Sequence, residues 1–148
     1  MPIHERIWNQ QRFGEPPDAG WFAVRQPGIV RFLSARLQGD ALVLGLFAAH
    51  RISLAFQAAT GRPDERVTSA DLARSEESVY RRKHDGNDVS SRGHDMADRH
   101  PALIAWITAF LEDPPVPLAR DEQRDLGMAL LTVAHAFDRS NADDGAAR

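Results

Sequence analysis

The chain contains no cysteine among its 148 residues. It can therefore form neither a disulfide nor a thiolate zinc site, and it has no cysteine nucleophile. Small secreted domains often need disulfides, so their absence favours a reducing compartment, and we predict a cytoplasmic location. The N-terminal residues show no charged segment followed by an apolar run, so we predict no signal peptide.

A large excess of charge of either sign is also missing. The formal net charge is −3 and the pI is about 6.0. A mildly acidic chain has no general attraction for nucleic acid or anionic lipid. The basic run 81–83 is followed by Asp85 and Asp88, which bring the local charge close to neutral. Nucleic-acid binding is therefore disfavoured.

The common catalytic motifs are absent as well. The sequence has no Gly-x-Ser-x-Gly elbow for a nucleophilic serine and no glycine-rich loop for phosphates. No motif of these two classes supports an enzymatic function, so we favour a non-enzymatic role.

Apolar residues, in contrast, are plentiful, at 43% of the chain. This share suits a single soluble domain with its own core. The most apolar stretch is 41–59, which is interrupted by His50, Arg51, Ser53 and Gln57. Placing Arg51 in the middle of a membrane would cost about 2.5–3.5 kcal/mol. We therefore predict no membrane span, and expect 41–59 to be the buried central helix of a bundle.

Helical spacing of apolar residues predicts four further helices, at about 27–37, 68–83, 101–111 and 121–137. Pro27 and Pro101 suit first helical turns, and Thr68 with Asp71 resembles a capping box. Gly39 suits a C-terminal cap, and Asp121 suits an N-cap. The predicted fold is mainly all-α, with about five helices in a compact bundle around an apolar central helix.

The two ends of the chain differ from this helical domain, which we place at 27–139. Residues 1–26 read as an irregular N-terminal arm, in which Trp8 and Trp21 pack onto the body. Residues 140–148 are small and polar, and we expect a flexible tail.

The densest group of ionisable residues lies in 84–100, which contains three histidines and four aspartates. Imidazole and carboxylate together can bind zinc, manganese or iron. Asp-Gly and neighbouring serines are also ordinary turn residues, so the segment could equally be a solvated loop. The sequence leaves both interpretations open.

A longer pattern, His50, then His94-Asp95, then Asp138, has the order His, His-Asp, Asp. This order loosely resembles the HD superfamily of metal-dependent phosphohydrolases, which are all-helical. The resemblance implies that His50, His94, Asp95 and Asp138 bind a divalent metal that activates water. In that family the His-Asp pair ends an apolar helical stretch, whereas here it follows the polar segment 89–93.

Two functions follow from these patterns. The favoured one is a protein-interaction or regulatory module without a cofactor, because a helix that is apolar all round needs more burial than a few helices provide. A protein partner or a second copy of the chain, forming a homodimer, would supply it. The alternative is the metal-dependent phosphohydrolase. Coverage of the apolar surface by the N-terminal arm would instead leave a monomer.

Overall fold

A computed structural model describes residues 24–60, 66–84 and 100–146. These residues form five α-helices and no strand, which confirms the predicted all-α fold. The arm before residue 24 lies outside the described residues. The helices are α3 (Pro27–Arg36), α4 (Gly39–Thr60), α5 (Ser69–His84), α7 (Pro101–Glu112) and α8 (Arg120–Ala146).

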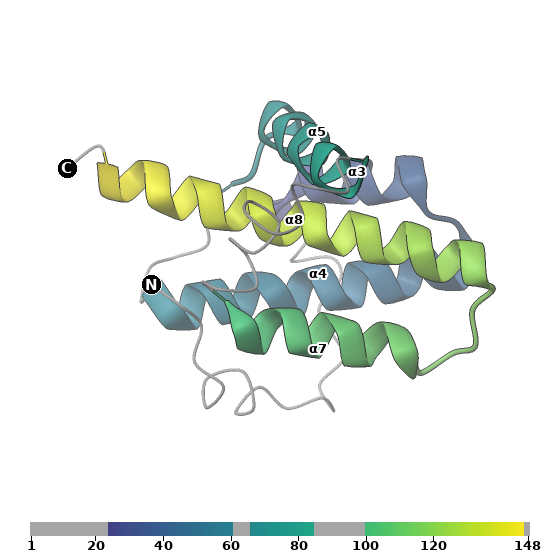
Figure 1. Cartoon of the computed structure of the whole chain (residues 1–148). Coiled ribbons are helices and arrows are strands. Elements are labelled where there is room, and N and C mark those ends of the chain that lie inside the picture. Colours follow the sequence, from purple (N-terminus) through teal and green to yellow (C-terminus); the bar gives the residue numbers. More distant parts are fainter. Residues whose placement is uncertain (1–23, 61–65, 85–99, 147–148) are drawn as a thin grey trace.

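Helix α8 packs against all four other helices (Figure 1). In the view of Figure 1, α3 and α5 lie above α8 and α4 and α7 lie below it, and α3 contacts α4 as well as α5. The fully buried apolar side chains gather between α8 and its neighbours. Helix α4 is largely buried, as the sequence predicts, but it keeps one side toward solvent, where Val43 is 64% exposed.

The direction of each helix follows from contacts at its two ends. Gly45 of α4 lies against Leu126 of α8, and Phe56 stacks on Phe137 eleven residues further along both helices. Helices α4 and α8 are therefore parallel. Helix α7 runs the opposite way, because its start contacts the later part of α8 and Leu111 contacts Gly127. Helices α7 and α8 are therefore antiparallel, and the connector 113–119 joins them.

The predicted helix starts are confirmed at three positions. Pro27 and Pro101 stand in the first turns of α3 and α7. The capping box of α5 forms in both directions, since the Thr68 N–H donates to the Asp71 carboxylate at 3.0 Å and the Asp71 N–H donates to the Thr68 hydroxyl at 3.1 Å. The first of these bonds holds the pKa of Asp71 below its usual value. The cap therefore stabilises the fold above the ordinary carboxyl pKa and weakens as the pH falls below it.

Three predicted helix ends differ from the structure. Helix α3 ends at Arg36 with Leu37 extended, and Gly39 takes its positive φ of 56° as the first residue of α4. Helix α8 begins at Arg120, where the Ala119 N–H donates to the Glu122 carboxylate, so Asp121 is not the cap. Helix α8 also continues to Ala146, because no proline interrupts its hydrogen bonds after residue 120. The flexibility predicted for 140–148 stays a prediction.

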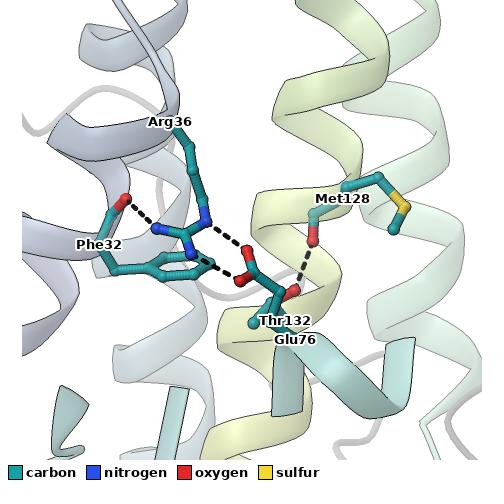
Figure 2. A network of polar contacts seen from close by, with 5 residues as sticks. All are labelled: Phe32, Arg36, Glu76, Met128 and Thr132. Atoms are coloured by element: carbon teal, nitrogen blue, oxygen red, sulfur yellow. Dashed lines mark hydrogen bonds and ion pairs between the residues drawn. The ribbon is translucent and has the colours of Figure 1, made fainter. Parts of the chain in front are cut away.

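Polar contacts join α3 to α5 (Figure 2). The Arg36 guanidinium donates two hydrogen bonds to the Glu76 carboxylate and one to the Phe32 carbonyl, and it lies 4.0 Å from the centre of the Phe32 ring. At the other end of α3, a Cβ on Gly28 would lie 2.7 Å from the Val67 carbonyl oxygen. Glycine thus allows α3 to approach the start of α5 closely.

Candidate functional site

A buried histidine–aspartate pair joins α7 to α8. His100 stands at the N-cap of α7, and its Nε2 lies 2.7 Å from an Asp138 carboxylate oxygen of α8. His100 is 1% exposed and Asp138 is 7% exposed. The edge of the imidazole meets the Phe56 ring, with the ring centres 5.3 Å apart. The pair is therefore a polar contact inside an aromatic part of the core, where water cannot readily replace either partner.

A second buried polar contact joins α8 to α5. His135 Nδ1 lies 3.0 Å from the Ser75 hydroxyl, and both residues are buried. On the same helix the Thr132 hydroxyl donates to the Met128 carbonyl one turn earlier (Figure 2). These hydrogen bonds satisfy polar groups in the otherwise apolar middle of α8. Helix α8 thus contacts its neighbours through specific polar pairs as well as through apolar packing.

The four predicted metal ligands are only partly placed by the structure. His94 and Asp95 lie outside the described residues. His50 is buried on α4, and Asp138 contacts His100. Phe56 of α4 lies level with Phe137 of α8, so Asp138 lies level with Gln57 of α4. Gln57 follows His50 by seven residues, which separates Asp138 from His50 by about 10 Å along the helix axis. Two ligands of one ion must both reach to about 2 Å from it, so this offset weighs against a shared metal.

Within the described part of the chain, no group of three or more histidine, aspartate or glutamate side chains could hold a metal ion. The four-residue ligand set, His50, His94, Asp95 and Asp138, stays a prediction. Among the polar residues that interrupt the apolar stretch of α4, His50 and Ser53 are also buried, and Gln57 is half-buried. These three residues are candidates for internal polar contacts of the bundle.

Aromatic rings join α4 to α7. Phe47 of α4 stacks on Phe110 of α7 with ring centres 6.3 Å apart, and Phe110 stacks in turn on Trp106 at 5.0 Å. The Arg51 guanidinium lies 5.4 Å from the centre of the Trp106 ring, a cation–π arrangement. Burial lowers the pKa of Arg51, yet an arginine remains charged in proteins. Arg51 is thus accommodated beside an aromatic ring of the neighbouring helix.

The outward side of these two helices is mostly apolar, and we call it the α4/α7 apolar face. Its exposed uncharged polar residue on α7 is Thr108, whose hydroxyl donates to the Ile104 carbonyl. The Phe47–Phe110 stack joins the two helices, which lie side by side in Figure 1. Val43, Ala105 and Ala109 are exposed, and Leu46, Phe47 and Trp106 are half-buried. The face is defined by six residues: Val43, Leu46 and Phe47 of α4, and Ala105, Trp106 and Ala109 of α7.

Charged residues are scarce on these two helices. Asp40 and Arg51 are the charged residues of α4, and Glu112 is that of α7. The stretch Gly39–Ala58 has the length and composition of a membrane span, but most of it is buried, as in the core helix of a bundle. The part that remains exposed is an apolar patch of the kind that marks binding surfaces.

Sequence reasoning selected Asp138 but did not find its contact with His100. Pro101 indicates that His100 stands at the helix N-cap, but no local signal points to a contact with a residue 38 positions away. The sequence also predicted an apolar excess on 41–59, but it could not show which side stays exposed. No family model matches the chain, and no curated protein or solved structure is significantly similar to it.

Proposed function

We propose that this protein is a protein-interaction module whose binding surface is the α4/α7 apolar face. The observation that carries the proposal is the exposure of Val43, at 64%, one turn before the half-buried Phe47, whose ring is linked through Phe110 to the half-buried Trp106. Large apolar and aromatic side chains with few charges around them are typical of the centre of protein interfaces. Contact with a partner would remove these side chains from water, which is the main favourable term in association.

Site-specific photo-crosslinking in cells tests this proposal. A photoreactive amino acid at position 43 or 105 is expected to form a discrete protein adduct, because both positions lie on the face. The same amino acid at Ala73 is the matched control, since Ala73 is also an exposed helical alanine but lies on α5. Mass spectrometry then identifies the adducts.

Three outcomes of this experiment contradict the proposal. These are no protein adduct at 43 and 105, equal labelling at 73, or adducts with lipid in place of protein. The last outcome would assign the face to a membrane surface. Thermal melts of each variant provide the folding control, because exposed substitutions usually change stability by less than about 0.5 kcal/mol.

The metal-dependent phosphohydrolase has less support, and metal binding separates it from an interaction module. We expect manganese, zinc, nickel and iron ions to leave the melting temperature of the purified protein unchanged. The measurement is a thermal melt with each ion, together with the metal content by mass spectrometry, for the natural chain and for Asp95→Ala. A stoichiometric metal that raises the melting temperature only when Asp95 is present would favour the hydrolase.

A further inference from the structure

We infer that the N-terminal segment of this chain, residues 1–23, docks on the outer side of the second half of α4. The outer side of α4 is the side that bears Val43, His50 and Gln57, and the docking concerns its part around His50 and Gln57. This contact is separate from the proposed binding of a partner, because it joins two parts of one chain. Phe47 lies about one turn before His50, so the docked segment borders the α4/α7 apolar face.

His50 is more deeply buried than its direction on α4 explains. Residues seven apart on a helix point nearly the same way, so His50 lies on the same side of α4 as Val43. It points away from Ala48, which is fully buried in the core. Yet His50 is 9% exposed, whereas Val43 is 64% exposed. The outer side of α4 is therefore covered near His50 and open near Val43.

No neighbouring helix in the described part of the chain is centred on this side of α4. Helix α8 contacts Phe56, which is about 120° around the helix from His50. Helix α7 contacts Phe47 and Arg51, about 60° and about 100° from His50 in the other direction. Helix α3 packs at Gly45, about 140° from His50. The cover at His50 thus requires a further segment of polypeptide.

The polar side chains here suit a segment without regular secondary structure. His50 and Ser53 are both buried, and both have a partner. Buried polar groups of this kind are hydrogen-bonded in native proteins. An irregular segment has backbone N–H and C=O groups that no helix uses, so it can supply such bonds. The glycines and prolines in 14–20 predict an irregular backbone for the N-terminal segment.

The N-terminal segment enters the bundle beside the same half of α4. It leads into α3, whose Leu33 and the following Leu37 lie against Gly45 in the first half of α4. Since residues 37–38 join the two helices, α3 folds back along α4 and its start lies toward the second half. At that start the Gln26 side chain accepts a hydrogen bond from the Val67 N–H at 2.9 Å, and Val67 comes seven residues after the end of α4.

Composition distinguishes 1–23 from the other segments outside the described residues. The segment 61–65 is short and has no large apolar side chain, and 85–99 is polar apart from Val89 and Met96. The N-terminal segment carries six large apolar side chains: Ile3, Ile7, Trp8, Phe13, Trp21 and Phe22. Docking on a helix removes such side chains from water, which is the main favourable term in association.

The covalent connection favours this segment over a separate molecule. A stretch of 23 residues spans at most roughly 80 Å, whereas the whole of α4 is about 33 Å long. A short flexible connection gives an effective concentration on the order of millimolar. A separate protein competes with the segment only above that concentration or with a higher affinity. Docking within one chain is therefore expected at every protein concentration.

Photo-crosslinking within the purified full chain tests the docking. A photoreactive amino acid replaces Gln57, which is half-buried on the outer side of α4. After digestion, mass spectrometry is expected to find position 57 linked to a peptide from 1–23. The matched control is the same amino acid at Ala73 on α5, which should form no such link. An equal mixture of chains with natural and heavy nitrogen separates links within one chain from links between two.

The inference is overturned by a link from position 57 to 85–99 in place of 1–23, or by no link at all. Links that join a heavy peptide to a light one overturn it as well, because they assign the cover to a second copy. Partner adducts at positions 43 and 105 report separately on the proposed function. The docking can therefore fail while the proposed function holds, and the reverse.

Hydrogen exchange at the imidazole C2 atom measures the cover without a crosslinker. The full-length variant Trp8→Ser/Trp21→Ser removes two large apolar side chains from the segment, so we expect exchange at His50 to become about tenfold faster or more. His135 is the internal control, because it is 8% exposed but is covered by α5 through Ser75. An unchanged rate at His50 contradicts the docking. Equal acceleration at His135 also contradicts it, since the segment would then stabilise the whole bundle and not cover one side of α4.

Discussion

Replacing Asp138 with alanine is expected to lower the free energy of unfolding by about 2–4 kcal/mol. The carboxylate is the hydrogen-bond partner of His100, and His100 is 1% exposed. Without Asp138, the imidazole keeps a buried polar nitrogen that water cannot reach without opening the core. The measurement is chemical denaturation of the purified chain at fixed protein concentration.

Two control variants separate the hydrogen bond from other effects of the substitution. Asp138→Asn keeps an oxygen that can accept from the imidazole, so we expect a smaller loss of about 1 kcal/mol. Arg139→Ala changes the next residue, which is exposed, and should change stability by less than about 0.5 kcal/mol. If Asp138→Ala is as stable as Arg139→Ala, the His100–Asp138 contact contributes nothing to the stability of the fold, and this polar pair does not hold α7 on α8.

A double-mutant cycle with His100→Ala isolates the coupling between the two side chains. Removing both partners leaves no orphaned polar group, so the double variant should be more stable than the sum of the two single losses implies. We expect a coupling between about 1 and 3 kcal/mol. Additive losses would show that the two residues stabilise the fold separately, through packing.

The helices of this fold were predictable because their signals are local. A proline in the first turn and a side chain that caps its own backbone act within four residues, so Pro27, Pro101 and the Thr68–Asp71 box can be read from the sequence. How the helices pack against one another was harder to predict from the sequence. Composition indicates how much of α4 must be buried, but not which neighbour buries it.

The central place of α8 was hidden by its polar residues. Thr132, His135 and Asp138 give the helix the pattern of a surface element, yet all three are buried. Each is accommodated by a hydrogen bond, and two of these bonds reach residues 38 and 60 positions away in the chain. A sequence pattern does not contain such long-range partners. For the same reason the order His50, His94-Asp95, Asp138 could not show that Asp138 contacts His100.

The contrast between α8 and α4 leads to a prediction with matched substitutions in the two helices. Leu130→Ala removes a side chain of α8 that is fully buried, so we expect a loss of about 2–5 kcal/mol in the free energy of unfolding. Leu46→Ala makes the same change on the outward side of α4, where the side chain is half-buried. Its expected cost is about 1 kcal/mol, because less apolar surface returns to water.

The comparison is made by chemical denaturation of the purified chain at a fixed, low protein concentration. A smaller loss for Leu130→Ala than for Leu46→Ala would mean that α4, and not α8, forms the centre of the bundle. The two substitutions thus distinguish the fully buried centre of the bundle from the outward side of α4.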